Sequence, residues 1–340
     1  MLFCRYASSY ISSAYISLNI LFYRFFLFVL FLVAGFRDTI GCDWQNYEHI
    51  FNYQASIALA AMALKGEVGF YALTNTIKYF NLSYIHLNVA CAFIFFYGFN
   101  VLAKRQKDPL TFLALAFPIL IIGLPMSGIR QGAAVGILCI ALICFIDKKV
   151  LKFIALVILA TSFHTSAIVF LALTPFIKNS FSLKTIFIGT ILLSPILLLE
   201  SVANIFSIYS ARYMDSEMDS TGAIFRLGIM VLTSLYFFVF LKTRWKRYYP
   251  EDYQLILMGA IATLLCFCFL ALSTTAADRL GYYLIPFQLI ILARIQFFPS
   301  KYRRLATIFP FLLIMSTFFI WAEFSSFFNS CYSPYAIKFF

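Results

Sequence analysis

Positively charged side chains at the ends of apolar segments are the residues of this sequence best suited to bind an anion. The chain has several clusters of Lys and Arg in its loops. The cations that belong to none of these clusters and that are candidates for anion binding are Arg37, Arg130, His164, Arg212 and Arg279. An Arg at mid-depth in a bilayer costs about 2.5–3.5 kcal/mol on insertion scales, so it is rarely kept without a partner. One interpretation pairs each Arg with lipid phosphate or with a nearby carboxylate, from the set Asp38, Asp43, Asp215 and Asp278. The other has the guanidinium forks converge on a polyanion such as a lipid-linked pyrophosphate, because Arg binds phosphate in a bidentate manner.

The segment Ser127-Gly128-Ile129-Arg130-Gln131-Gly132 opens an apolar run that is predicted to be a helix. Arg130 therefore lies at a helix N-terminus, where the helix dipole also favours a bound anion. The glycines at positions 128, 132 and 136 form a GxxxG series, which on its own indicates close helix packing rather than chemistry.

A carboxylate beside a substrate hydroxyl is the usual general base for group transfer. Asp43 is the first candidate, because it shares one outward turn with Arg37 and lies one helical turn before Tyr47. The alternative for Asp43 is a salt bridge that holds Arg37 in place. His164 is the second candidate, since a membrane-buried imidazole can titrate near neutrality.

The sequence gives no indication of a metal site or of nucleic-acid binding. Cys266-Phe-Cys268 lacks the spacing of a metal site and has no His nearby. The net charge of +12 comes largely from basic residues in short loops between apolar segments, where they signal membrane topology. Cys42 and Cys331 are both expected on the outer side, and the sequence is compatible with a disulfide between them or with two free thiols.

The composition requires that these residues be positioned by membrane-spanning helices. Hydrophobic residues make up 63% of the 340-residue chain and charged residues 12%. An average soluble domain has roughly 45–50% and about 25%, so this chain could not cover a water-exposed surface. Long apolar runs favour helices over strands in lipid. We therefore predict an all-α, polytopic membrane protein of about 10–12 transmembrane helices, with residues 1–340 forming one transmembrane domain and no soluble domain.

Basic clusters between the apolar runs predict the topology. The clusters lie at 104–107, 148–152, 178–184, 242–247 and 301–304. If all face the cytoplasm, each neighbouring pair is separated by an even number of crossings. The predicted crossings are 109–124, 128–146, 185–203, 224–241, 252–272, 279–296 and 305–322. Segment 153–177 is too long for one crossing and has Lys at both ends, so it is predicted to form two half-helices that meet near His164.

The N-terminal third is less regular. Residues 83–103 are predicted to span the membrane, and 37–81 to form an interfacial, partly helical segment on the outer face. The first forty residues are compatible with one kinked helix or two. No cleavable signal peptide is predicted.

Several of these motifs together resemble the EpsG family of polysaccharide polymerases, which is related to Wzy. The motifs are Arg37-x-x-x-Gly41-x-Asp43-x-x-x-Tyr47, Gly128-Ile129-Arg130-Gln131-Gly132-x-Ala134, Phe163-His164, Asp278-Arg279-x-x-x-Tyr283 and Ser333-Pro334-Tyr335. Each motif alone is weak, but their order and spacing are fairly specific, and the resemblance extends from about residue 24 to residue 335.

The resemblance implies a GT-C-like glycosyltransferase of the bacterial inner membrane that needs no cofactor. Such an enzyme polymerises undecaprenyl-pyrophosphate-linked oligosaccharide repeat units at the outer, periplasmic face, in O-antigen, capsule or exopolysaccharide biosynthesis. Its expected partners are the lipid-linked oligosaccharide as donor and acceptor, membrane lipid and a chain-length regulator protein. The residues expected to bind pyrophosphate or glycan are Arg37, Tyr47, Arg130, Gln131, Arg212, Arg279 and Tyr283, and the expected catalytic residues are Asp43 and His164.

Other functions remain open on the sequence. A flippase for lipid-linked oligosaccharide would also need outward cations, but it should show paired repeats and polar residues that continue to the cytoplasmic side. Neither feature is visible. An O-antigen ligase would share the chemistry but tends to carry a large outward loop, whereas the longest late loop here is 209–221. A membrane acyltransferase and a purely structural membrane protein are the remaining alternatives.

Overall fold

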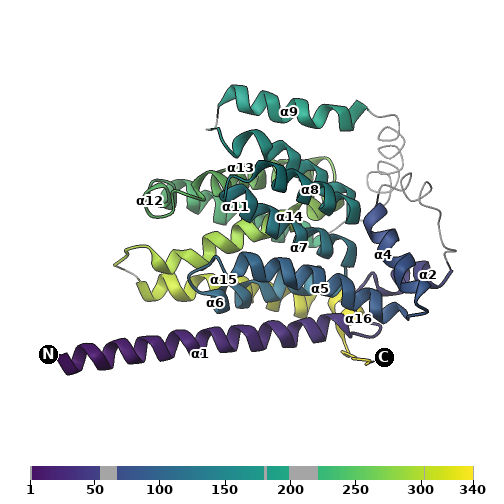
Figure 1. Ribbon diagram of the computed structural model, residues 1–340, viewed down its shortest axis with the longest axis horizontal. Coiled ribbons are helices and arrows are strands. Elements are labelled where there is room, and N and C mark those ends of the chain that lie inside the picture. Colours follow the sequence, from purple (N-terminus) through teal and green to yellow (C-terminus); the bar gives the residue numbers. More distant parts are fainter. Residues whose placement is uncertain (1, 54–66, 180–181, 199–220, 302, 340) are drawn as a thin grey trace.

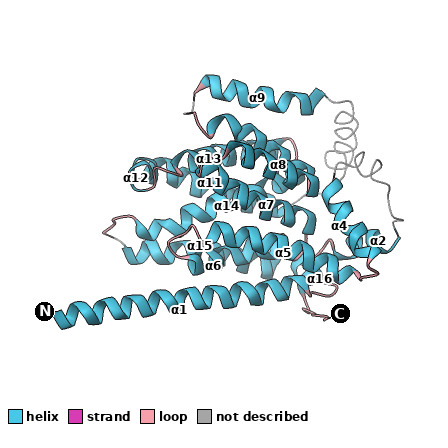
Figure 2. Cartoon of the chain, viewed as in Figure 1, coloured by secondary structure: helices cyan, strands magenta, loops and turns pink. Residues whose placement is uncertain are grey.

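The computed structural model describes residues 2–53, 67–179, 182–198, 221–301 and 303–339. Every regular element within these ranges is a helix, and the one isolated β-bridge among them joins Arg37 to Ile337. The all-α class that the composition predicted is therefore confirmed. Figures 1 and 2 show the long helices running side by side in one bundle.

Seven helical stretches in the described ranges are long and apolar enough to cross a membrane. The helices that form them are α1 (Leu2–Gly35), α5 (Tyr84–Ala103), α7 (Ile129–Ile146), α11 (Thr221–Tyr236) with η3 (Phe237–Leu241) and α12 (Lys242–Tyr248), α13 (Tyr253–Cys268) with η4 (Phe269–Ala271), α14 (Thr274–Arg294) with η5 (Ile295–Phe297), and α15 (Arg303–Phe324). Shorter apolar helices lie between them: α6 (Pro109–Ala116) with η1 (Phe117–Ile121), α8 (Val150–Phe163), η2 (Thr165–Phe176) and α9 (Leu183–Leu198). The N-terminal alternatives are resolved, because α1 is a single helix of 34 residues.

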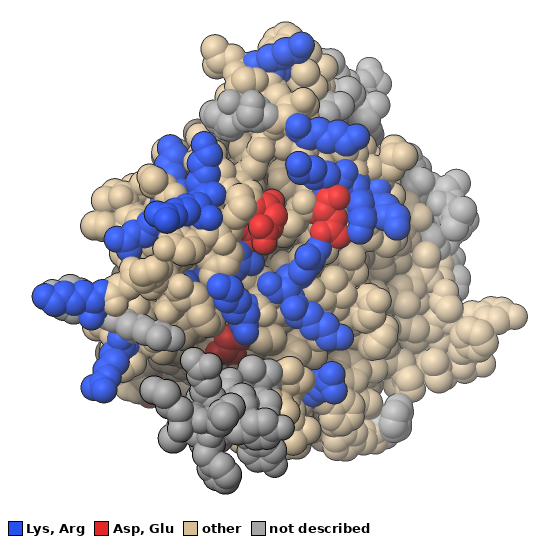
Figure 3. Space-filling view, turned by 60° about the vertical axis from the view of Figure 1, so that its left-hand side comes forward, with Lys and Arg blue, Asp and Glu red and all other residues tan. Residues whose placement is uncertain are grey.

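The basic clusters meet at one end of the bundle, where Figure 1 shows α12. The contacts that join the loops there are Arg105 with Asp147, Lys107 with the rings of Tyr249 and Phe297, and Gln254 with the Asn179 carbonyl. Figure 3 shows Lys and Arg side chains spread over this end, with few acidic ones among them. The clusters that the sequence assigned to one face therefore share one face.

Within the described ranges, the opposite end carries the short helices α2 (Trp44–Tyr53), α4 (Val68–Tyr79) and α16 (Ser326–Tyr332). The predicted interfacial segment 37–81 supplies α2 and α4, and its residues 54–66 lie outside the described ranges. The C-terminal segment fastens this end to the loop after α1. Asp38 N donates to Ala336 O, Lys338 N donates to Phe36 O, and Gly41 N donates to Cys331 O at 2.7 Å.

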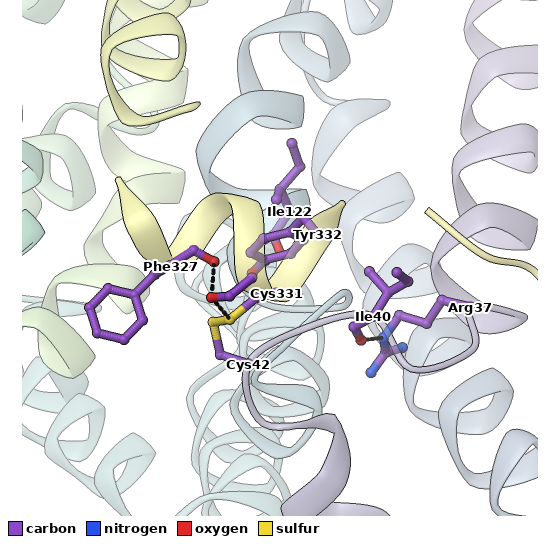
Figure 4. Close-up of a disulfide and its surroundings, with 8 residues drawn as sticks. Arg37, Ile40, Cys42, Ile122, Phe327, Cys331 and Tyr332 are labelled. Atoms are coloured by element: carbon purple, nitrogen blue, oxygen red, sulfur yellow. Dashed lines mark hydrogen bonds between the residues drawn. A yellow bond between two sulfur atoms is a disulfide. The ribbon is translucent and has the colours of Figure 1, made fainter. Parts of the chain in front are cut away.

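Cys42 and Cys331 form a disulfide at the same end, 289 residues apart in sequence. Figure 4 shows this bond between α16 and the loop that follows Arg37. The sequence left the pairing open, and the structure selects the disulfide.

The predicted break in segment 153–177 is confirmed. α8 ends at Phe163 and η2 begins at Thr165, so His164 alone separates them. The two helices pack against each other, and the chain therefore turns back at His164. η2 has twelve residues in 3-10 geometry, whereas such runs rarely exceed three or four.

Close packing of glycines holds α7 in the core. A Cβ on Gly136 would collide with the backbone of Phe95, and one on Gly98 would collide with the backbone of Gly136. Of the small-residue series, Gly136 therefore serves α5–α7 packing, whereas Gly132 lies against the backbone of Leu124 and Pro125. The fixed α7 in turn places Arg130, its second residue, at the end that carries α2 and α4.

Candidate functional site

Arg130 lies between three elements at this end of the bundle. Its Nη1 donates to Oε2 of Glu67, the residue just before α4, at 2.5 Å. Its Nε donates to the hydroxyl of Tyr47, which lies on α2, at 3.3 Å. The guanidinium also stacks on the rings of Tyr47 and Phe70, with 5.2 and 5.6 Å to their centroids. The Arg130 side chain is 25% exposed and that of Glu67 7%. An anion arriving from outside would therefore reach Arg130 before it reached Glu67.

Glu67 connects Arg130 to the break at His164. Its carboxylate accepts the backbone N–H of Thr165, the first residue of η2, and lies within electrostatic reach of Arg279 on α14. Burial raises the pKa of the Glu67 carboxyl, and the Arg130 guanidinium opposes that shift. No motif in the sequence indicates Glu67. Its only signal is that, apart from Lys65, the residues on either side of it are not charged.

His164 and Tyr283, both singled out from sequence, meet in one hydrogen-bonded group. His164 Nδ1 lies 2.9 Å from the Tyr283 hydroxyl and 2.6 Å from Ser166 Oγ, which donates to the Tyr283 hydroxyl at 3.1 Å. The imidazole is buried and within electrostatic reach of Arg130 and Arg279. Two neighbouring cations together with burial favour the neutral form of the ring.

Gln131 links α7 to α14 directly. Its Nε2 donates to the Arg279 carbonyl at 2.5 Å. Arg279 and Tyr283 lie one turn apart on α14, because the helix begins at Thr274 and is capped by Ser273. The predicted crossings 252–272 and 279–296 leave residues 273–278 as a loop, whereas α14 already begins at Thr274. Ser273, a residue type that favours the N-cap position, is the sequence signal for this earlier start.

A second ion pair lies at the same end, between Arg226 on α11 and Asp278 on α14. The Arg226 guanidinium stacks over Tyr282, with 4.4 Å to the ring centroid. Asp43 lies within electrostatic reach of Tyr47 and of Tyr282, and therefore lies between the two pairs. The sequence offers Asp278 as a counterion but gives no signal for Arg226, which lies near the start of an apolar helix.

Arg37 is fully buried. Its Nε donates to Ile40 O at 3.0 Å, its Nη1 to Ala34 O at 2.7 Å and its Nη2 to Asn88 Oδ1 at 3.2 Å, and Figure 4 shows the contact with Ile40. The suggested ion pair with Asp43 is not among the salt bridges of the described residues. Arg37 thus closes the turn after α1, and burial lowers its pKa.

Two further points complete the candidate site. Arg212 lies outside the described residues, so its place relative to Arg130 stays a prediction. Within the described ranges, no group of three or more His, Cys, Asp and Glu side chains could hold a metal ion. The chemistry that the described side chains can supply is anion binding by guanidinium groups and proton transfer by carboxylates or an imidazole.

Comparison with known protein families identifies the chain. The family model of the EpsG family matches residues 20–337, nearly the whole chain. No curated protein and no solved structure matches the sequence. The chain belongs to the EpsG family, a family of Wzy-like polysaccharide polymerases.

Proposed function

From this family membership, we propose that the chain is a membrane glycosyltransferase that polymerises undecaprenyl-pyrophosphate-linked oligosaccharide repeat units. It works at the outer, periplasmic face of the bacterial inner membrane, in O-antigen, capsule or exopolysaccharide biosynthesis. The observation that carries the proposal is the group around Arg130. Its partly exposed guanidinium lies at a helix N-terminus, beside Arg279 and His164, at the end of the bundle opposite the basic clusters.

The reaction transfers the growing glycan from one lipid carrier to a sugar of another. A hydroxyl oxygen of the acceptor bonds to the anomeric carbon of the donor, and the bond from that carbon to pyrophosphate breaks. The electron pair of that bond stays with the pyrophosphate, which leaves on its lipid. Guanidinium groups around the leaving group would stabilise the charge that develops on it. A carboxylate or an imidazole accepts the hydroxyl proton.

Charge and cysteine chemistry support the outward orientation. Basic residues accumulate on the cytoplasmic side of membrane proteins, and they gather here at the end that carries α12. Disulfides form and persist in oxidising compartments such as the periplasm, and the Cys42–Cys331 bond lies at the opposite end.

The proposed substrate-binding residues are Tyr47, Arg130, Gln131, Arg279 and Tyr283. Arg37 acts as a support for the loop that carries Asp43, since its nitrogens all bind the protein. Asp43 and His164 remain the catalytic residues that the sequence predicts, and Arg212 a further predicted ligand of the anion. Membrane lipid and a chain-length regulator protein remain predicted partners.

The test is polymerisation in vitro. Purified protein is reconstituted in liposomes with a defined undecaprenyl-pyrophosphate-linked repeat unit, and the products are separated on a gel. We expect a ladder of products spaced by one repeat unit, with stoichiometric release of undecaprenyl pyrophosphate. Movement of the lipid-linked unit across the bilayer without any ladder would instead establish a flippase. Transfer to a different acceptor without self-polymerisation would establish a ligase.

A further inference from the structure

Glu67 occupies the meeting point of the helices around Arg130. It directly precedes α4, pairs with Arg130 on α7 and accepts the N–H of Thr165 on η2. Tyr47 on α2, Tyr71 on α4 and Arg279 on α14 lie within electrostatic reach of it. Five helices therefore come close to this one carboxylate, and two of them, α7 and η2, donate hydrogen bonds to it.

The hydrogen bonds of Glu67 leave room for a substrate. An ionised carboxylate offers about four acceptor positions. The structure assigns two donors to Glu67, namely Arg130 Nη1 and the Thr165 N–H. Among the described residues, about two acceptor positions are thus left for a sugar hydroxyl.

Arg130 can hold Glu67 and an anion together. A guanidinium has about five N–H donors in a planar fork. Two of those on Arg130 go to Glu67 and to the Tyr47 hydroxyl. Since about three find no partner among the described residues, a pyrophosphate can bind Arg130 while the carboxylate stays beside it. The carboxylate and the bound pyrophosphate then share one site, in which an acceptor hydroxyl and the anomeric carbon can be held together.

The two catalytic residues predicted from sequence are less well placed to accept a proton. His164 Nδ1 is already engaged by Ser166 and Tyr283, and the ring lies beside two guanidinium groups that oppose a further positive charge. Asp43 is half-buried and makes no ion pair among the described residues. A carboxylate removed from water is the stronger base, and Glu67 is the more buried of the two.

We propose that Glu67 is the general base of the transfer reaction, an inference that rests on the proposed glycosyltransferase function. A Glu67 carboxylate oxygen takes the proton of the acceptor hydroxyl as that oxygen bonds to the anomeric carbon. The carbon–oxygen bond to pyrophosphate breaks, the pyrophosphate keeps the electron pair, and Glu67 later returns its proton to water.

Binding of the donor would itself activate the base. Arg130 stabilises the ionised Glu67, whereas burial raises the pKa of Glu67. A pyrophosphate bound to Arg130 adds negative charge beside the carboxylate, which favours the protonated form further. The proton affinity of Glu67 therefore rises when the donor is in place.

The experiment compares Glu67→Gln and Glu67→Asp with wild type in the liposome assay. The matched control is Glu48→Gln, a half-buried carboxylate on α2 that makes no ion pair among the described residues. Binding of undecaprenyl pyrophosphate and the polymerisation rate at saturating substrate are measured separately. General-base catalysis contributes about 10²–10⁴-fold. We expect Glu67→Gln to bind the lipid within about threefold of wild type and to polymerise at least about 100-fold more slowly, with Glu48→Gln unchanged.

The pH profile separates a catalytic role from a positioning role. In wild type the rate should fall on the acid side as Glu67 is protonated, above the ordinary Glu pKa of about 4.3, because burial raises its pKa. In Glu67→Gln this acid limb should disappear from the residual rate. An unchanged acid limb, with weaker lipid binding and an unchanged maximal rate, would show that Glu67 only positions Arg130.

Two further outcomes are decisive. If Glu67→Gln does not accumulate in the membrane, Glu67→Asp tests the proposal instead. This variant should bind the lipid normally and polymerise more slowly than wild type, and its rate should still fall on the acid side. A full rate in Glu67→Asp or in Glu67→Gln overturns the proposal. Failure of wild type to form polymer overturns the proposed function, whereas an active wild type with active Glu67→Gln overturns only the role of Glu67.

Discussion

Buried ion pairs are weak evidence for stability, because removing two charges from water offsets their attraction. The end of the bundle that carries α12 holds one such pair, Arg294 with Asp252, and Arg294 Nε also donates to Gln106 Oε1. The pair of Arg130 with Glu67 differs, since a quarter of the Arg130 side chain is exposed and part of its donor set is unused. A fully buried ion pair holds the fold together. An ion pair whose Arg is partly exposed can in addition bind an anionic ligand.

Arg130→Lys tests that difference. The substitution keeps the charge but loses the planar fork, and bidentate pairing with phosphate is not reproduced by an ammonium group. We expect folded protein whose polymerisation is reduced about 10- to 100-fold, as the loss of a charged hydrogen bond suggests. The control is Arg244→Lys at the basic end, where Arg244 contacts only the Pro299 carbonyl among the described residues. Equal activity of the two variants would indicate that Arg130 binds no anion.

Arg37 and Asp43 have separate roles, which their single and double variants distinguish. Arg37→Gln removes a fully buried guanidinium that holds two backbone carbonyls and Asn88, so it should lower the free energy of unfolding by about 2–3 kcal/mol. Asp43→Asn should leave the thermal midpoint in detergent nearly unchanged. Because the two side chains form no ion pair, Asp43→Asn should not restore the stability of Arg37→Gln. Recovery in the double variant would contradict the structure.

The activity of Asp43→Asn ranks the two carboxylates as bases. If Glu67 is the base, this variant polymerises within about tenfold of wild type, since general-base catalysis contributes about 10²–10⁴-fold. If instead Asp43 is the base, as the sequence predicts, the Asp43→Asn variant should bind donor lipid yet form no polymer. Rates of Asp43→Asn and Glu67→Gln measured side by side decide between them.

At the scale of elements, the sequence predicted what depends on local pattern. The break at His164 followed from a segment with Lys at both ends that was too long for one crossing, and the start of α7 followed from its small residues. Glu67 could not be assigned to Arg130 in this way, because 63 residues separate them and only tertiary packing brings α4 to α7. Arg226 was overlooked for a similar reason, since an Arg near the start of an apolar helix reads as a snorkelling residue until its partner is seen.

The contact between α5 and α7 predicts a sensitive glycine. In Gly136→Ala the new Cβ would meet backbone atoms of Phe95, so the two helices must separate. Overpacking of this kind costs about 1–3 kcal/mol, and it would also displace Arg130 on α7. We expect a lower thermal midpoint in detergent and reduced polymerisation. Gly228→Ala on α11 is the control, because a Cβ there meets nothing within 4 Å and helix propensity favours Ala. Equal stability of the two variants would show that α5 and α7 do not pack closely.

The two ends of the whole molecule share some contacts and differ in one kind of bond. Both contain ion pairs and cations over aromatic rings, as between Arg105 and Asp147 at the end that carries α12 and between Arg226 and Asp278 at the opposite end. The opposite end is in addition held by the Cys42–Cys331 disulfide and by hydrogen bonds from the C-terminal segment to the loop after α1. Ion pairs serve in any compartment, whereas the disulfide requires an oxidising one. The bundle therefore has a chemical polarity along the direction in which it would cross the membrane.

Thiol labelling in intact cells tests this polarity. Among the described free thiols, Cys91, Cys139, Cys144 and Cys266 are buried and Cys268 is exposed. A background that combines Cys4→Ser with Cys268→Ser therefore leaves few thiols open to a membrane-impermeant maleimide. In that background, Cys42 and Cys331 should be labelled from outside, and only after a reductant opens their disulfide. A Lys246→Cys variant on α12 should be labelled only after the inner membrane is permeabilised. Labelling of position 246 in intact cells would reverse the topology and place Arg130 and Glu67 on the cytoplasmic side, away from the periplasmic substrate.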